Sequence, residues 1–413
     1  MINNTRKIWG ITRTAVSRVL WPSHILFEQE DPNMTTSNMT RRDLMGALGA
    51  SALGAGLLGT ASRPLKAQAA SSLAGGPIID THIHMWKLPR SLPPMSDFGT
   101  YPGDPTDGFC CTVNAANPSG VVPWLQQDAL IPNYLANWGG RRVTQVVLVE
   151  SSVGVTASNI IQSNLWMLGA AGSDTSGPDG GSKILSVVGA LDTTQDTTTF
   201  QEQLMQLVGN PLFVGIRLGD LGSIFSPNGP STFANLKPNV LQNIKTMAGM
   251  GLQIDANGIP GAALADIGQA TGIAIVMDHF AGEGNTFTPS GVWVQDMRAA
   301  ATYPGLHIKV SDVEVLSEAA LGGYTFGPSQ FQPIADPTQY YPVMEFLWNL
   351  FGHKRLLWGS NWPVCRYGGI LTDPVEFEID IWESFLAQQL EGRNAVMYKN
   401  ALRVYGPGSP SRI

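Results

Sequence analysis

Eight short apolar segments recur along the chain, and together they predict an α/β fold, a (β/α)8 TIM barrel. Each segment is followed by a polar or glycine-containing loop and then by an amphipathic segment. The short segments are apolar on both faces, as expected of parallel strands covered on both sides. Parallel strands need crossover connections, so this alternation fits a closed barrel surrounded by helices. An open doubly wound sheet is the alternative, but no G-x-G-x-x-G follows the first strand, which disfavours a nucleotide-binding version.

The predicted strands follow one another between residues 77 and 359. They are Pro77–Ile83, Val143–Val149, Ile184–Leu191, Phe213–Leu218, Leu252–Ala256, Ile273–Met277, Leu306–Val310 and Arg355–Gly359. Two intervening segments carry helix signals. Asp196–Val208 opens with capping residues and continues with apolar side chains at helical spacing. Asp373–Leu386 begins with aspartate before proline, the pairing expected of an N-cap and the first helical position.

Two long insertions interrupt the pattern. Lys87–Pro123 follows the first strand, and Gly322–Tyr341 follows the seventh. Loops that follow barrel strands lie at the catalytic end, so these insertions are predicted either to roof a pocket or to form surface excursions. With the insertions included, residues 70–413 are predicted to form one barrel domain.

The first 69 residues resemble an export signal rather than a folded segment. Thr40–Met45 contains a twin arginine, a run rich in Gly and Ala follows, and Ala67–Ala69 matches a cleavage pattern. The sequence therefore predicts a twin-arginine signal peptide and a periplasmic or secreted protein, with a membrane anchor as the alternative. If translation starts at Met34 or Met39, residues 1–33 are not part of the protein and the start codon has been wrongly assigned.

Charge and cysteine content exclude some functions. Of the 25 Lys and Arg and the 32 Asp and Glu residues, eight and four lie in the predicted leader, which leaves 17 and 28 and a formal net charge of −11. A chain with this balance is not expected to bind nucleic acid. Three cysteines are too few for a disulfide framework, and Cys365 is interpreted as structural. The predicted partner is a small-molecule substrate, without a stable membrane anchor, and the oligomeric state stays open.

Polar side chains follow nearly every predicted strand. The carboxyl ends of the strands form the active site of such barrels, so these residues are the candidates for chemistry. They are His82, His84, Glu150, Asp192, Arg217, Asp220, Asp255, Asn257, Asp278, His279, Ser311, Asp312 and Asn361. Asp192, Asp220 and Asp312 are equally compatible with capping helices or fixing loop turns.

Three of the six histidines are the leading candidates. His82 and His84 form a His-x-His pair on the first strand, and side chains two residues apart on a strand point to the same face. His279 closes the sixth strand. If these strand ends meet, the three imidazoles can share one metal ion or one substrate oxygen.

Motifs at three strand ends carry a resemblance to a known family. Asp80-Thr-His-Ile-His84 ends the first strand, Asp278-His279 ends the sixth, and Trp358-Gly-Ser-Asn-Trp-Pro-Val-Cys365 includes the end of the eighth. In this order they resemble the amidohydrolase superfamily, and within it the amidohydrolase-related branch that includes sugar lactonases of the fuconolactonase type and 2-pyrone-4,6-dicarboxylate hydrolase. The resemblance covers about residues 77–405. It implies a (β/α)8 barrel and hydrolysis, most often of a lactone.

The resemblance also implies roles for individual residues. His82, His84 and His279 would hold a divalent metal or polarise the lactone carbonyl, with zinc as the candidate ion and metal-free catalysis as the alternative.

Three further residues are assigned to substrate binding. Arg217 matches the region of a fourth-strand arginine and would bind a substrate carboxylate or carbonyl. Trp86 and Trp362 lie beside the motifs and would line the pocket, although packing in the core is the usual role of tryptophan.

Asn361 departs from the family pattern. Relatives carry Gly-Ser-Asp-Trp-Pro where this chain has Gly359-Ser-Asn-Trp-Pro363, and that aspartate is the expected water-activating base and metal ligand. An amide does not accept a proton at working pH, and general-base assistance is typically worth ~10²- to 10⁴-fold in rate. Three interpretations follow. Another carboxylate acts as base, first Glu150 and then Asp278 or Glu283, while Asn361 orients the water; or the protein is a decarboxylase; or it binds a small carboxylate or sugar without turnover.

Overall fold

Eight parallel strands rich in valine and isoleucine form the centre of the molecule. They are β1 (Ile78–Ile83), β2 (Val143–Val149), β3 (Ile184–Gly189), β4 (Phe213–Leu218), β5 (Gln253–Ala256), β6 (Ala274–Met277), β7 (Leu306–Val310) and β8 (Leu356–Trp358). Each strand pairs with the next in sequence order. An isolated parallel bridge joins Ile83 to Trp362, and His84 N donates to Trp362 O at 2.7 Å. The strands therefore form a nearly closed barrel, which confirms the predicted fold class.

The computed structural model describes the barrel and most of its connections. The described residues are 76–86, 129–136, 143–151, 159–177, 180–219, 223–282, 289, 291–313, 336–365, 374–387, 389 and 391–406. The predicted leader, the whole first insertion and residues 322–335 of the second lie outside these ranges. The rest of the second insertion was predicted as loop, but Pro337–Tyr340 forms a 3₁₀ helix, η4.

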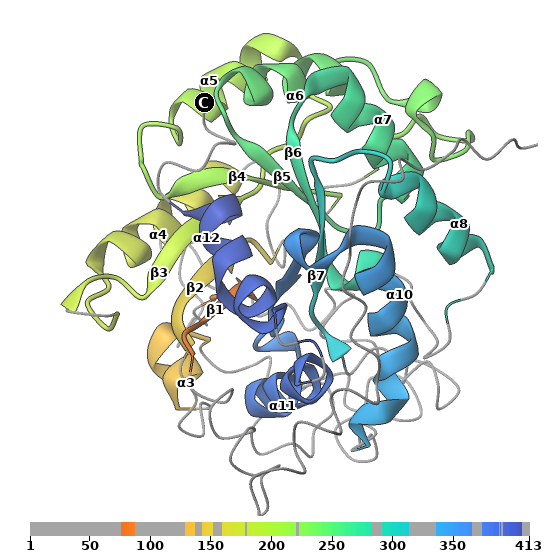
Figure 1. Ribbon diagram of the computed structural model, residues 1–413. Coiled ribbons are helices and arrows are strands. Elements are labelled where there is room, and N and C mark those ends of the chain that lie inside the picture. Colours follow the sequence, from red (N-terminus) through yellow and green to blue (C-terminus); the bar gives the residue numbers. More distant parts are fainter. Residues whose placement is uncertain are drawn as a thin grey trace, which may run out of the picture. The chain divides into compact units, whose positions relative to one another are not determined.

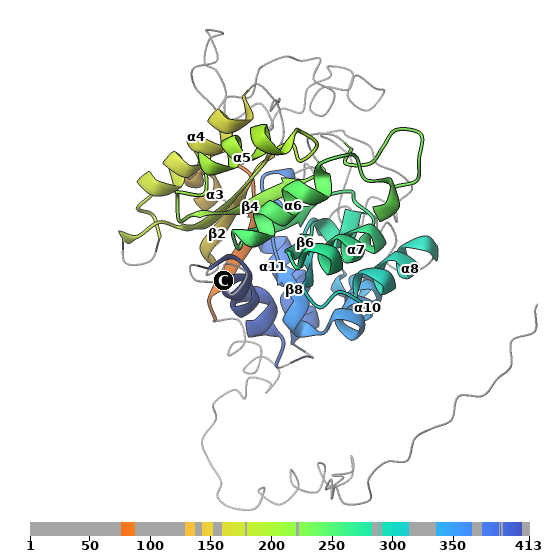
Figure 2. The ribbon, with the colours of Figure 1, turned by 90° about the horizontal axis from the view of Figure 1, so that it is seen from above.

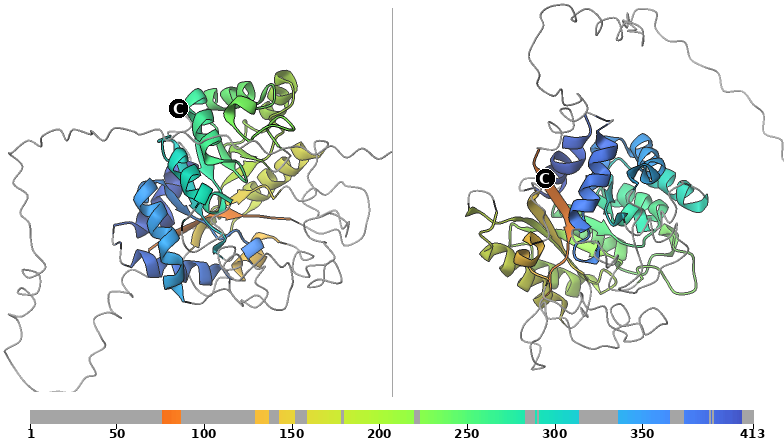
Figure 3. Two further views of the ribbon diagram at one scale, coloured as in Figure 1. Left: turned by 90° about the vertical axis from the view of Figure 1, so that its right-hand side faces the viewer. Right: turned by 90° about the horizontal axis from the view of Figure 1, so that it is seen from below.

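Helices surround the strands (Figures 1, 2 and 3). They are α3 (Ile131–Leu135), α4 (Ile160–Ser173), α5 (Thr197–Met205), α6 (Val240–Gly249), α7 (Gly261–Thr271), α8 (Gly291–Ala300), α10 (Tyr341–Phe351), α11 (Pro374–Leu386) and α12 (Asn400–Tyr405). Short helical turns are η2 (Phe233–Asn235), η3 (His279–Gly282), η5 (His353–Arg355) and the π-helical η7 (Ala395–Lys399). Asp196 caps α5 by accepting from Thr199 N at 3.0 Å, as its sequence predicts. None of the helices in the described ranges combines the length and apolarity that a membrane span needs.

Two apolar regions hold the barrel together. The larger one lies between the strands and the surrounding helices. The smaller one lies inside the barrel and includes Ile79, Leu185, Val214 and Leu357, each the second residue of its strand. Ala401, Val404 and Tyr405 of α12 belong to this inner cluster. We infer that α12 closes the amino-terminal end of the barrel, which leaves the carboxyl ends of the strands for the site.

Candidate active site

Asp80 fixes β1 against the segment that follows β8. Its carboxylate accepts hydrogen bonds from Ser360 N at 2.8 Å, Ser360 Oγ at 2.6 Å and the Tyr134 hydroxyl at 2.8 Å. Burial raises the pKa of this carboxyl, and the bonds from Ser360 oppose the rise. The tie places Asn361, the next residue, beside the His-x-His pair: Asn361 Oδ1 is 3.1 Å from His84 Nε2.

The two histidines of β1 approach each other through their Nε2 atoms, which are 3.2 Å apart. His84 Nδ1 lies 2.8 Å from Val149 O. Because a carbonyl oxygen only accepts, this Nδ1 carries the proton and the neutral ring presents a lone pair at Nε2. His84 is therefore held in one tautomer by the backbone of β2.

Lys309 on β7 lies against this site and was not among the residues predicted from the sequence. Its Nζ is 2.6 Å from Asp255 Oδ2, 3.0 Å from Asp278 Oδ1 and 3.1 Å from His82 Nδ1. The Tyr405 hydroxyl also donates to Asp255, at 2.8 Å. An ammonium only donates, so His82 Nδ1 accepts and Nε2 carries the proton of the neutral ring. A charged residue inside the apolar strand Leu306–Val310 was the available signal, since a buried lysine is normally paired.

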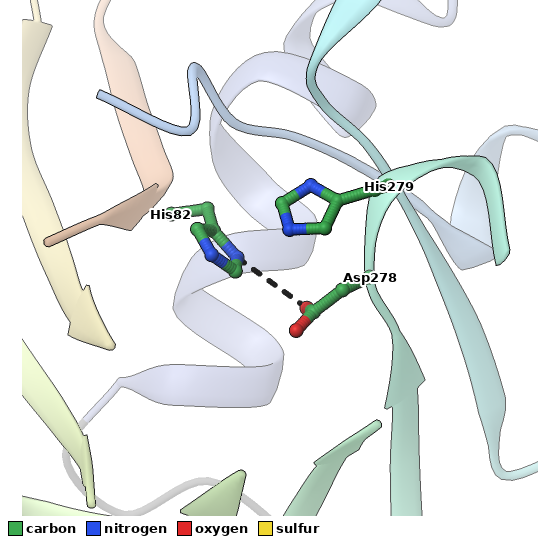
Figure 4. Close-up of side chains that lie close together, drawn as sticks. All are labelled: His82, Asp278 and His279. Atoms are coloured by element: carbon green, nitrogen blue, oxygen red, sulfur yellow. Dashed lines mark ion pairs between the residues drawn. The ribbon is translucent and has the colours of Figure 1, made fainter. Parts of the chain in front are cut away.

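Arg217 links β4 to the histidine that follows β6. Its Nε donates to Asp278 Oδ2 at 3.0 Å, and its Nη2 lies 3.2 Å from His279 Nε2. Because the guanidinium only donates, Nε2 of His279 accepts, and Nδ1 donates to Ser311 Oγ at 3.0 Å. The ring centroids of His82 and His279 are 4.5 Å apart, and Figure 4 shows both rings and the Asp278 carboxylate close together. The three histidines predicted from the sequence thus converge on one region.

The three imidazoles are neutral near pH 7. Burial lowers the pKa of His84 and of His279 to about 3, and the Arg217 guanidinium contributes to both shifts. Burial and the Lys309 ammonium together hold the pKa of His82 well below its usual 6.5.

Asp278 is ionised in this environment. Burial opposes its ionisation, but Lys309, His82 and Arg217 hold the pKa of its carboxyl well below the usual range. A carboxylate stabilised in this way is a weak proton acceptor. Its contacts with Lys309 and Arg217 instead indicate that it holds these two side chains in position.

Left-handed backbone occurs at three strand ends around the site. The φ angle is 50° at His279, 65° at Asp312 and 55° at Asn361. Side-chain-bearing residues rarely adopt this conformation, although Asn, Asp and His do so more readily than most. Burial raises the pKa of the Asp312 carboxyl to about 7, opposed by its hydrogen bond with the Asn361 side chain and by the Arg217 charge.

The Glu150 carboxylate is directed toward its own loop and α4. Its Oε1 accepts from Ser151 N at 2.9 Å and its Oε2 from Ser163 Oγ at 2.7 Å. Asp192 stabilises a turn, because its Oδ1 accepts from both the backbone and the hydroxyl of Thr194. Asp220 and Glu283 lie outside the described residues.

The two tryptophans predicted to line a pocket are buried. The Trp362 ring packs edge-on against Tyr134, with centroids 5.3 Å apart. Trp86 pairs through its backbone with Ala129. The structure therefore shows a packing role for both, and substrate contact stays a prediction.

One group of described side chains could hold a metal ion. His82, Asp278 and His279 each offer a donor atom within 4.8 Å of the others (Figure 4). The sequence predicted His84 as the third ligand, whereas this group contains Asp278 instead. His84 nevertheless contacts His82 directly. Nitrogen and oxygen donors suit a divalent ion such as zinc.

Two fixed positive charges lie against the same side chains. Lys309 contacts His82 and Asp278, and Arg217 contacts Asp278 and His279. A divalent ion would compete with both, so the donor set fits an ion that is held weakly.

Comparison with known proteins places these features in a wider context. A family model for amidohydrolases matches residues 79–406. The chain is 29% identical over 195 residues to an L-fucono-1,5-lactonase from Burkholderia ambifaria, which covers 46% of this chain and 59% of that enzyme. The matched stretch thus spans less than two thirds of the lactonase.

Solved structures share the fold. An amidohydrolase from Burkholderia multivorans, solved with bound zinc, aligns with a TM-score of 0.56 and 15% identity over 80% of this chain and 99% of that one. A probable 2-pyrone-4,6-dicarboxylic acid hydrolase from Acinetobacter baumannii, solved with citric acid bound, gives a TM-score of 0.50 and 16% identity over 79% and 98%. With three histidines at the end of an eight-stranded barrel and a family match over most of its length, the chain belongs to the amidohydrolase family, in the amidohydrolase-related branch.

Proposed function

We propose that the protein is a hydrolase that opens a lactone or a similar cyclic ester. The observation that carries this proposal is the convergence of three neutral imidazoles and one guanidinium at the end of the barrel. His82 and His84 meet at 3.2 Å, and Arg217 lies 3.2 Å from His279. The likeness to an L-fucono-1,5-lactonase supports a lactone as the substrate class.

The residues divide the reaction between them. Arg217 stabilises the carbonyl oxygen as it gains negative charge. Asn361 orients a water molecule, and a carboxylate, Glu150 in the sequence prediction, takes its proton. The water oxygen bonds to the carbonyl carbon, the ring C–O bond breaks, and the released alkoxide takes up a proton. The product is an open-chain hydroxy acid.

A divalent metal, with zinc as the proposed ion, would be held by His82, His84 and His279, and Asp278 offers a further oxygen. When bound, such an ion polarises the substrate carbonyl as a Lewis acid. The zinc bound by the Burkholderia multivorans amidohydrolase supports this ion. Elemental analysis of the purified protein before and after zinc supplementation tests the proposal, and absence of zinc after supplementation would remove it.

Asn361 favours a second candidate function, a barrel that binds a small carboxylate or sugar without turnover. Assays of the wild type and Asn361→Asp against a panel of lactones separate the two. We expect the wild type to hydrolyse at least one lactone and Asn361→Asp to hydrolyse it faster. No turnover by either, while a small carboxylate still raises the melting temperature, would favour the silent binder.

We further propose that the protein is exported by the twin-arginine route, on the basis of Thr40–Met45. Replacing Arg41 and Arg42 with lysine should retain the protein inside the cell. Unchanged fractionation of this variant would contradict the proposal.

A further inference from the structure

A buried carboxylate, that of Asp312, pairs with Asn361 at the end of the neighbouring strand. β7 and β8 are adjacent, with Val310 opposite Trp358. Asp312 follows β7 and Asn361 follows β8, so the two residues are neighbours at adjacent strand ends, and the Asn361 side chain favours the charged form of the Asp312 carboxyl. Because Asn361 also contacts His84 Nε2 at 3.1 Å, its amide lies between this carboxylate and the His-x-His pair.

The residues on either side of Asp312 are both anchored. Ser311 Oγ bonds to His279 Nδ1 at 3.0 Å, and Val313 N donates to Glu378 Oε1 at 3.0 Å. With φ at 65°, the backbone of Asp312 is held in the left-handed region between these anchors. The backbone of Asp312 therefore has a defined position at the end of β7, the strand that pairs with β8.

Asp312 differs from the other acidic groups of the site in access and in contacts. It is 7% exposed, whereas Asp278 is fully buried between Lys309 and Arg217. Glu150 spends both carboxylate oxygens on local hydrogen bonds. Asp312 is thus the described carboxylate that combines a contact to Asn361 with a small accessible surface.

We propose that Asp312 is the carboxylate that takes the proton of the attacking water, one strand away from Asn361. The assignment rests on the proposed hydrolase function and replaces Glu150 in that role. One water O–H bond breaks, its proton passes to an Asp312 oxygen, and the water oxygen bonds to the carbonyl carbon. The same proton then leaves with the alkoxide of the opened ring, which restores the carboxylate.

The ability of Asp312 to accept a proton at neutral pH supports the assignment. Burial brings the pKa of this carboxyl to about 7, near the value at which a general base works best at that pH. The charged group that faces it is Arg217.

Three variants and one control test the proposal on a lactone that the wild type hydrolyses. Asp312→Asn keeps shape and tolerates left-handed φ, so it should fold; we expect kcat to fall ~10²- to 10⁴-fold with little change in KM. The double variant Asp312→Asn/Asn361→Asp moves the carboxylate by one strand and should recover at least part of kcat. The control Asp192→Asn should retain most activity, and Glu150→Gln shows whether the large loss of kcat belongs to Glu150 instead. Circular dichroism and thermal unfolding establish that each variant is folded.

Each result has a distinct meaning. A folded Asp312→Asn variant with wild-type kcat, or the large loss appearing in Glu150→Gln instead, would overturn the assignment and leave the hydrolase function standing. A loss without recovery in the double variant would assign Asp312 a structural role. Failure of the wild type on every lactone would overturn the proposed function itself and the assignment with it.

Discussion

At the scale of single residues, two buried cations determine the state of the histidines. Lys309 donates to His82 Nδ1 and Arg217 lies against His279 Nε2, so each ring has a fixed tautomer. The cations are balanced by Asp255 and Asp278. Removing one partner of such a buried ion pair is typically far more costly than removing an exposed one. We infer that this charge balance preorganises the ring N–H groups before substrate arrives.

Asp312→Asn should make stability less dependent on pH. The wild-type carboxyl has a pKa of about 7 when folded, against about 3.8 when unfolded. Between these values the folded state binds the proton more strongly, so its advantage is complete at low pH and is lost as pH rises toward 7. Asparagine carries no proton to lose. Relative to the wild type, the variant should therefore gain about 2 to 3 kcal/mol of unfolding free energy between pH 5 and pH 8.

Urea unfolding at the two pH values measures this difference. Asp192→Asn, which alters a turn carboxylate, should follow the wild-type pH dependence. Parallel curves for the wild type and Asp312→Asn would mean that the carboxyl has an ordinary pKa.

The sequence allowed a partial prediction at this scale. The His-x-His pair, His279 and Arg217 could be identified because strand alternation and strand order bring them to one end of the barrel. The role of Lys309 could not, because it depends on which carboxylates face it across the interior. Asp312 was equally compatible with a turn residue, since its pairing with Asn361 depends on two left-handed backbone conformations that the pattern does not specify.

At the scale of elements, the ends of the strands are positioned by ties between neighbours. Asp80 of β1 holds Ser360, and Glu378 of α11 holds Val313 after β7. Three strand boundaries, those of β2, β4 and β7, coincide with the predicted ones. β3 was predicted to reach Leu191, but it ends at Gly189. The prediction was too long because Ala190 and Leu191 are apolar and buried although they no longer pair with a neighbouring strand. A run of apolar residues therefore predicts which residues are buried, but it does not predict where hydrogen bonding between strands ends.

Ser360→Ala should loosen the tie between β1 and the residues after β8. The hydroxyl donates to Asp80 Oδ2 at 2.6 Å and accepts from Trp362 N at 3.0 Å. Its loss leaves two buried groups without this partner, at an expected cost of about 1 to 3 kcal/mol. The variant should also lose activity, because Asn361 is the next residue. Chemical denaturation and a lactone assay measure both effects.

Ser173→Ala provides the matched control, since this serine lies exposed in α4 and bonds only to its own helix. Its unfolding free energy and activity should match the wild type. If Ser360→Ala and Ser173→Ala had the same unfolding free energy and activity, the hydrogen bonds of Ser360 would contribute nothing measurable to stability or catalysis.

At the scale of the whole molecule, α12, which closes the amino-terminal end of the barrel and forms its floor, is connected to the candidate active site. Tyr405 of α12 packs in the inner apolar cluster and donates to Asp255 at 2.8 Å. Asp255 binds Lys309, and Lys309 binds His82. A continuous set of contacts therefore runs from the closing helix to the candidate active site.

Tyr405→Phe should lower both stability and hydrolysis. The change removes one donor to a buried carboxylate, at an expected cost of about 1 to 3 kcal/mol, and alters the charge around Lys309. Tyr303→Phe is the matched control, because that hydroxyl donates to Ile273 O at 2.8 Å without touching the charged groups. Both variants should unfold more easily, but only Tyr405→Phe should reduce kcat. An equal effect on kcat would contradict a link between the floor and the site.

The position of α12 in the chain has a consequence for biosynthesis. The ribosome makes Tyr405 after all eight strands, so a nascent chain can pair its strands while the charged interior still lacks its floor. Until that helix docks, Asp255 lacks the hydrogen bond from the Tyr405 hydroxyl, and the charges that hold Lys309 against His82 are incomplete. A nonsense mutation shortly before residue 400 should therefore abolish catalysis as fully as the loss of His82, although it would spare every residue at the mouth of the barrel.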